Sequence, residues 1–245
     1  MQDGLVLLTT AYRQLLGEID AWFDACLRAA PPGMLACRRG CSACCRGLFD
    51  ISLLDAFLLR EGFAQLPPAV VEAVLARCRP RLAELQGRWP QLANPWLLNT
   101  LADDSWTAMP EGDATPCPLL GGDGLCLAYP FRPLTCRLHG LPNIDLSGED
   151  FSTDRCTLHA GDPHTLPDAT LRWRFRAAFA REFDLLRELT RRLGGTPTCE
   201  ADTFIPLALL ADYAAVDWPQ AILGRPAPSP CLTVPPPAAP PRSSR

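Results

Sequence analysis

Four cysteines lie within one short stretch of the chain, the segment CRRGCSACC at residues 37–45. Such a group of thiols can form disulfides, can bind a soft metal such as zinc or iron, or can pack as small apolar side chains on one face of a helix. Further along, a segment rich in glycine and proline carries more cysteines. The two groups are Cys37, Cys41, Cys44 and Cys45, followed by Cys117, Cys126, Cys136 and Cys156.

The packing alternative requires residues 37–45 to be helical, because only then would the four thiols share a face. Gly40 and the preceding 31–33 segment, Pro-Pro-Gly, disfavour a helix there. In a helix, Cys37 and Cys45 would also lie about 12 Å apart, at a rise of about 1.5 Å per residue. No mononuclear site spans that distance. The segment is therefore a knuckle, or its thiols divide between two centres, or they hold a multi-iron cluster, and all three arrangements stay open.

The disulfide alternative depends on the cellular compartment. The first twenty residues have no basic segment and only a short apolar run, unlike a secretory signal. No stretch reaches the roughly 20 apolar residues of a membrane span. We therefore expect a cytoplasmic protein with reduced thiols, in which grouped cysteines bind metals or act in catalysis more often than they form stable disulfides. A regulatory disulfide stays open as an alternative.

The metal alternative gains from the second group of cysteines. Zinc and iron–sulfur centres take four thiolates, and short spacings bring thiols together at little entropic cost. The sequence GGDG between Cys117 and Cys126 predicts a β-hairpin that returns the second thiol beside the first. Arginines next to the cysteines, among them Arg46 and Arg137, favour thiolate over thiol. We expect the two groups to converge on zinc or iron, bound as single ions or as an Fe–S cluster. The predicted ligands are Cys37, Cys41, Cys44, Cys45, Cys117, Cys126, Cys136 and Cys156.

Hydrophobic periodicity predicts a helical scaffold around these segments. The second expected helix can be capped by Asp50 or Ser52, and the third should break at Pro80. Residues 110–165 have no sustained period and look poor in core-forming residues. The sequence therefore predicts a mainly α fold, a helical scaffold around an irregular cysteine-rich metal-binding segment with a short β-hairpin. The expected helices cover residues 4–30, 53–63, 67–89, 95–104, 168–195 and 205–218.

We expect one helical domain, residues 1–224, that contains the cysteine groups at 37–45 and 117–156. The proline-rich tail at 225–245 is expected to be disordered. The net charge of -4 provides no basic field for nucleic acid, and no membrane partner is expected. All 23 basic residues are arginine and there are 26 prolines, which is typical of a GC-rich bacterial genome.

The remaining cysteines have simpler interpretations. Cys26 and Cys78 lie on apolar faces of expected helices and should belong to the core. Cys199 and Cys231 lie in a loop and in the tail, and we do not predict either as a ligand.

Several residues beside the second cysteine group could contribute to the site. His139 and His159 could each replace a thiolate as a ligand. Arg132 and Pro133 are expected to be structural, since proline fixes a turn and arginine can bond loop carbonyls. Tyr129 is expected to be a packed aromatic residue.

The order of the cysteine motifs resembles that of the YkgJ-type cysteine cluster proteins, described as zinc- or iron-chelating domains. The family pattern is CxxCC, then CPxL, then GxC with a tyrosine shortly after, then RPxxCR. The matching residues are Cys41, Cys44 and Cys45; Cys117, Pro118 and Leu120; Gly124, Cys126 and Tyr129; and Arg132, Pro133, Cys136 and Arg137. An upstream cysteine, here Cys37, is also usual in the family.

The resemblance covers roughly residues 37–156, with the insert at 46–116 unmatched, and it implies a metal-binding site. Some relatives resemble protein lysine N-methylases that modify flagellin, which supports an enzyme as the alternative, either a methylase or a redox enzyme that uses a cluster. A third hypothesis is a protein-interaction module with structural zinc. The chain has no glycine-rich nucleotide loop, no HExxH and no GxSxG motif.

Overall fold

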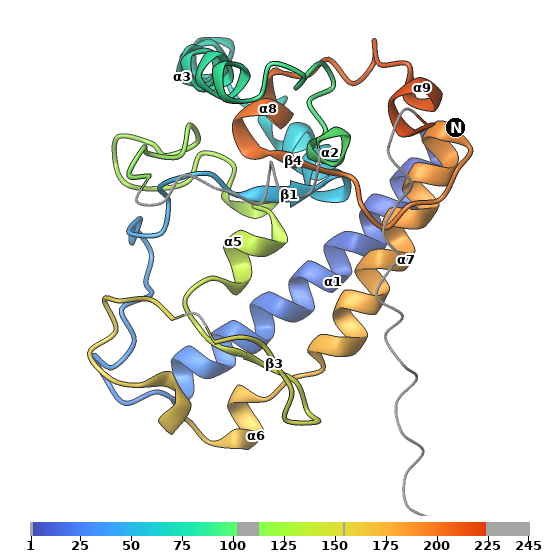
Figure 1. Cartoon of the computed structure of the whole chain (residues 1–245). Helices are drawn as coiled ribbons and strands as arrows, with labels where there is room; N and C mark the ends of the chain where they lie inside the picture. Colours follow the sequence, from blue (N-terminus) through green and yellow to red (C-terminus); the bar gives the residue numbers. More distant parts are fainter. Residues whose placement is uncertain (1, 102–112, 154, 224–245) are drawn as a thin grey trace, which may run out of the picture.

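The computed structural model describes residues 2–101, 113–153 and 155–223. It is mainly α-helical, and its strands form two small two-stranded sheets within the described residues. Figure 1 shows two long antiparallel helices, α1 (Gln2–Ala29) and α7 (Phe175–Gly194), lying side by side. The proline-rich tail at 225–245 lies outside the described residues.

The first expected helix is confirmed as α1. Its apolar positions recur at helical spacing and face the core, and the helix ends shortly before Pro31. At its C-terminal half, the indole of Trp22 donates a 3.0 Å hydrogen bond to the carbonyl of Leu171. The buried residues of α1 are Leu8, Tyr12, Leu15, Leu16, Ile19, Trp22 and Cys26.

Helix α2 (Leu53–Phe63) begins where the sequence predicts. The hydroxyl of Ser52 caps it by accepting the backbone N–H of Asp55 at 3.3 Å. Just before it, β1 (Asp50–Ser52) pairs antiparallel with β4 (Asp202–Phe204), a pairing that fixes the start of α2 against the C-terminal part of the chain.

The predicted break at Pro80 is wrong, because α3 (Pro68–Arg88) runs through it. Proline removes one backbone N–H, which costs stability but leaves the other bonds of the helix. Val74, Cys78 and Leu85 are buried on the same side of α3, so packing holds both halves of the helix to one surface. That surface includes α8 (Ile205–Leu210).

Two other expected helices differ from the structure. The helix expected at 95–104 is only a 3₁₀ turn, η1 (Leu98–Thr100), and its last residues lie outside the described part. The helix expected at 205–218 ends at Leu210 as α8, and α9 (Trp218–Leu223) follows separately. The carboxylate of Asp212 accepts the N–H of Ala214 at 3.1 Å, a local turn that competes with the helix.

The helix expected at 168–195 is divided into α6 (Asp168–Leu171) and α7. Between them, the N–H of Trp173 donates to the carbonyl of Ile144 and its carbonyl accepts the N–H of Leu146. These bonds attach Trp173 to β2 (Asn143–Ile144), which pairs with β3 (Asp150–Ser152). A backbone engaged in this bridge cannot also continue the helix.

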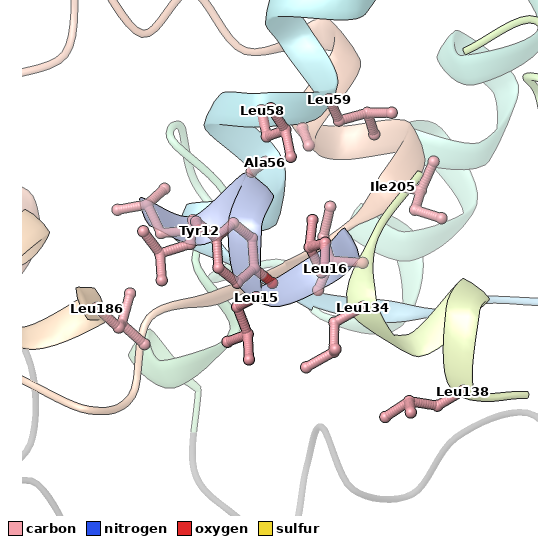
Figure 2. Close-up of a cluster of buried hydrophobic side chains, with 14 of the residues drawn as sticks. Tyr12, Leu15, Leu16, Ala56, Leu58, Leu59, Leu134, Leu138, Leu186 and Ile205 are labelled. Atoms are coloured by element: carbon pink, nitrogen blue, oxygen red, sulfur yellow. The ribbon is translucent and has the colours of Figure 1, made fainter. Parts of the chain in front are cut away.

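The middle of the chain supplies core residues, contrary to the expectation. It contains the turns η2 (Tyr129–Phe131) and η3 (Pro163–Thr165) and the short helix α5 (Leu134–Leu138), which contacts α1. Figure 2 shows Leu134 of α5 near Leu16 of α1, and Leu138 belongs to the same buried cluster. The buried apolar side chains of this middle part include Leu119, Ala128, Leu134, Leu138 and Leu141.

A buried polar group lies in the same core. The Tyr12 hydroxyl donates to Asp55 Oδ1 at 2.8 Å and lies 3.3 Å from Glu182 Oε1 on α7. Ser52 Oγ also donates to Glu182 Oε1, at 3.3 Å. The Tyr12 hydroxyl has one hydrogen and can donate it to only one of the two carboxyls. A proton on the other carboxyl therefore best satisfies the hydrogen bonds of this group.

Among the described residues, no helix combines the length and apolar character that crossing a bilayer requires.

Candidate metal centre

Residues 37–45 form two consecutive turns and no helix. The N–H of Cys41 donates to the carbonyl of Arg38, and the N–H of Cys45 donates to that of Ser42, each at 3.0 Å. Gly40 has φ +82, a conformation that glycine adopts at no steric cost. The helical-stripe alternative is therefore wrong, and the segment has the form of a knuckle.

The knuckle meets the second cysteine group through the backbone. The N–H of Cys117 donates to the carbonyl of Cys45 at 2.9 Å, and the N–H of Gly47 donates to the carbonyl of Thr115 at 2.8 Å. The flanking residues Arg46 and Pro116 form an antiparallel bridge. The two segments therefore meet through their backbones, and convergence of their thiols on a metal stays a prediction.

The expected hairpin between Cys117 and Cys126 is present as a tight turn. Its two sides pair through one isolated antiparallel β-bridge, between Leu120 and Cys126. The N–H of Leu127 donates to the carbonyl of Leu119 at 2.9 Å. The sequence prediction of a chain reversal is confirmed, and Cys126 returns towards the start of the segment.

Cys136 lies on α5, one turn after Pro133 begins the helix. The N–H of Leu134, at the first turn, donates to the buried carboxylate of Asp55 at 3.0 Å. This bond attaches the cysteine-bearing helix to the polar group in the core. Sequence reasoning missed Asp55 because nothing in its local pattern marks it as a partner of a residue 79 positions away.

Cys37 and Cys156 both lie close to Gly140. A Cβ on Gly140 would be 3.3 Å from the Cys37 Sγ and 3.7 Å from the Cys156 Cβ. The N–H of Cys156 donates to the carbonyl of Gly140 at 3.2 Å. Gly140 also has φ +112, so both its conformation and its surroundings favour glycine.

His159 holds this end of the knuckle together. Its Nδ1 accepts the N–H of Ala36 at 2.9 Å, and its Nε2 lies 2.7 Å from the carbonyl of Gly140, to which it donates. Both ring nitrogens take part in hydrogen bonds, so His159 links Ala36 to Gly140 and has a structural role. His139 is exposed. Its ring packs edge to face with the ring of Phe49, and the two ring centroids are 6.2 Å apart.

Burial makes most of these thiols difficult to ionise. Burial raises the pKa of Cys37 and Cys117 to about 11, and that of Cys136 well above its ordinary value. Negative charge on the neighbouring thiols raises them further. The pKa of Cys45 is lowered instead, because the Cys44 thiol donates a hydrogen bond to its sulfur.

The arginines have less effect than expected. Arg77 and Arg132 act to lower the pKa values of Cys117 and Cys126, but burial outweighs them and both values are raised. The guanidinium of Arg137 is engaged elsewhere, since it donates to the carbonyls of Arg132 and Pro130. A bound cation would offset the repulsion between the thiolates more effectively than these arginines do.

Arg132 shapes the loop, as expected for a structural residue, and Arg137 does so with it. Both pair with Asp20 on α1, and Arg132 also donates to the carbonyl of Tyr129 at 3.3 Å. The expectation for Tyr129 is wrong: its side chain is 58% exposed, with the Arg132 guanidinium 4.1 Å from the ring centroid. The two charged groups hold the loop to α1, which leaves the tyrosine ring facing solvent.

The two cysteines expected in the core are there. Cys26 and Cys78 are fully buried, and the Cys26 thiol lies 3.5 Å from the carbonyl of Thr170. Cys199 is also buried, whereas Cys231 lies outside the described residues. The eight predicted ligands are all partly buried free thiols.

The described ranges contain no three histidine, cysteine, aspartate or glutamate side chains close enough, as placed, to hold a metal ion. The backbone of residues 45–47 meets that of residues 115–117, but the thiols as placed do not close on an ion. The donors themselves suit zinc or iron, because soft thiolates are the ligands these metals take in four-coordinate sites.

Comparisons of the chain with protein-family models, with curated proteins and with solved structures find no match. Its function is therefore inferred from its own residues.

Proposed function

We propose that this protein is a cytoplasmic metal-binding protein that chelates zinc or iron through the thiolates of residues 37–45 and 117–156. The observation that carries the proposal is the meeting of these two segments, joined by the hydrogen bond from the Cys117 N–H to the Cys45 carbonyl. The two segments together carry eight free thiols, and α2 and α3 lie between them in the sequence. The resemblance to YkgJ-type proteins supports the same assignment.

The metal would stabilise the folded structure of the irregular part of the chain. Residues 37–47 and 113–127 contain turns and single bridges, with little regular secondary structure to hold them. A metal ion bound by both segments would join them more strongly than these few backbone bonds, because metal binding and folding are coupled. Burial of the thiols favours the same outcome, since a cation offsets the cost of ionising them together.

The test is metal content, measured with the absorption spectrum of protein purified without oxygen. We expect zinc or iron in stoichiometric amounts; absorption in the visible range indicates an Fe–S cluster, and a colourless zinc-loaded sample indicates zinc. Protein that folds fully and contains neither metal, even after incubation with each, would contradict the proposal. Release of an organic cofactor on denaturation would favour the enzyme alternative.

Variants separate ligands from packing residues. Cys45→Ser, Cys117→Ser and Cys136→Ser should each lower bound metal, because a hydroxyl is a poor substitute for a thiolate on a soft metal. Cys26→Ala and Cys78→Ala are the matched controls. Both remove a buried thiol outside the two segments, and they should keep the full metal content.

A further inference from the structure

Two of the cysteines stand opposite each other on paired backbone. The bridge between Arg46 and Pro116 is antiparallel, so one residue away from it Cys45 lies opposite Cys117. The 2.9 Å hydrogen bond from the Cys117 N–H to the Cys45 carbonyl agrees with this register. In Figure 1 the blue chain that leads into β1 passes the light-green loop before α5 at this contact.

The separation of these two residues suits a disulfide. Residues that stand opposite each other and share backbone hydrogen bonds in an antiparallel pair have Cα atoms about 5.5 Å apart, and their side chains leave the pair on the same side. A disulfide takes Cα atoms about 4.4–6.8 Å apart. Both thiols are free and partly buried. The backbone therefore holds Cys45 and Cys117 at a separation that a disulfide can span.

Other cysteines near Cys45 are less well placed as partners. Cys44 is its neighbour in sequence, and consecutive Cα atoms are about 3.8 Å apart, which is shorter than a disulfide favours. Cys126 stands opposite Leu120 in its own bridge. The backbone pairing therefore selects Cys117 as the partner of Cys45.

A small cavity gives access to this pair. It has a volume of about 20 Å³, and its lining includes Gly47, Arg77, Thr115 and Cys117. A cavity of this size holds about one molecule as large as water. Hydrogen peroxide is only slightly larger than water, so a small peroxide can reach Cys117 through this cavity where a bulky organic disulfide cannot.

We propose that Cys45 and Cys117 form a redox site, in which a small peroxide joins them in a reversible disulfide and the bond releases bound metal. Disulfides of cytoplasmic proteins are usually transient and redox-sensing, which agrees with a reversible bond. The bond itself needs no metal. Its effect on the metal rests on the proposed function, because the disulfide removes two of the eight proposed ligands.

The reaction consumes one peroxide and two thiolates. One thiolate attacks an oxygen of hydrogen peroxide, the O–O bond breaks, and a sulfenic acid and a hydroxide are formed. The second thiolate attacks the sulfenic sulfur, the S–S bond forms, and the S–O bond breaks to release a second hydroxide. Each hydroxide takes up a proton and becomes water. A dithiol reductant returns both thiols by exchange.

The test is treatment of the full-length protein, purified without oxygen, with one equivalent of hydrogen peroxide. Remaining thiols are alkylated, and linked peptides are identified by tandem mass spectrometry while released metal is measured with a chelating indicator. The wild-type chain should lose two hydrogen atoms, yield peptides joined at Cys45 and Cys117, and release its metal. A dithiol reductant should restore the starting mass.

Variants identify the two sulfurs. Cys45→Ser and Cys117→Ser should each yield no peptides joined between these positions. Cys44→Ser is the matched control, because it removes the adjacent thiol of the same segment, and it should keep the linked peptides. The mapping of the wild-type chain needs no substitution, so it decides the matter even where a variant fails to fold.

The outcomes separate this inference from the proposed function. A disulfide between other cysteines, or oxidation of single thiols without a bond, would overturn the redox site and leave the proposed function standing. The expected disulfide in a protein that binds neither zinc nor iron would overturn the proposed function and keep the redox pair. Metal that stays fully bound to the oxidised chain would overturn the link between the bond and metal release.

Discussion

The carboxylate of Asp55 accepts the backbone N–H of Leu134 at 3.0 Å, and it accepts the Tyr12 hydroxyl at 2.8 Å through the same oxygen. One buried side chain on α2 thus joins α1 in the core to the first turn of the helix that carries Cys136. Because Asp55 is 2% exposed, water cannot replace these bonds if the carboxylate is removed.

Asp55→Ala should lower the free energy of unfolding by about 2 kcal/mol or more, because it leaves buried donors without an acceptor. It should also weaken metal binding, since α5 loses its attachment to the core. Asp55→Asn is the matched control, because its amide oxygen can still accept both bonds. Chemical denaturation and zinc titration measure the two effects; equal stability of the alanine and asparagine variants would contradict the role assigned to this oxygen.

Glu182 should make the protein less stable as the pH rises. Burial and, to a smaller extent, the nearby charge of Asp55 raise the pKa of Glu182 from 4.5 to about 8. Hydrogen bonding with the Ser52 and Tyr12 hydroxyls acts to lower this pKa, and the negative charge of Asp202 on β4 acts to raise it. The folded protein therefore binds more protons than the unfolded chain between about pH 4.5 and 8, so this stabilisation is complete at low pH and is lost through that range.

Glu182→Gln should make the free energy of unfolding less dependent on pH. When the pH is raised from 5 to 8, the variant should gain about 1 kcal/mol or more in this free energy relative to wild type. Thermal denaturation at several pH values measures it. Glu188→Gln is the control, because exposed Glu188 has its pKa lowered to about 2 by Arg191 and Arg192 and is ionised throughout this range. A wild-type stability that rises from pH 5 to 8, with no change in Glu182→Gln, would exclude a protonated Glu182.

Gly140→Ala should disturb the end of the knuckle that holds Cys37 and Cys156. A methyl group there meets the Cys37 sulfur at 3.3 Å, and φ +112 is strained for any residue with a Cβ. We expect a loss of about 1–2 kcal/mol in the free energy of unfolding and a lower metal content. Gly122→Ala, which has nothing within 4 Å, should change neither quantity.

Deletion of residues 225–245 should leave metal content and thermal stability unchanged. This segment is rich in proline and has no hydrophobic period, and it lies outside the described residues. Metal analysis and thermal denaturation of the truncated protein measure the result. A large loss of either quantity would show that Cys231 or the surrounding tail has a structural role.

The sequence by itself determined the long helices and the buried residues on them. Helix α1, the Ser52 cap of α2 and the core positions of Cys26 and Cys78 follow from local signals: apolar residues at helical spacing and a side-chain oxygen placed to accept an N–H. It also identified the chain reversal between Cys117 and Cys126, because a glycine-rich turn is encoded within a few residues.

Only the tertiary structure decided the features that depend on distant partners. The chain leaves the helical path at Trp173 because its backbone bonds to β2, and α3 continues through Pro80 because both halves pack on one surface. His159 was a candidate ligand by composition, and its place as a clip follows from contacts with Ala36 and Gly140. A hydrogen bond between residues far apart leaves no periodic trace in the sequence, so spacing and residue type could suggest eight ligands without showing which distant segments meet.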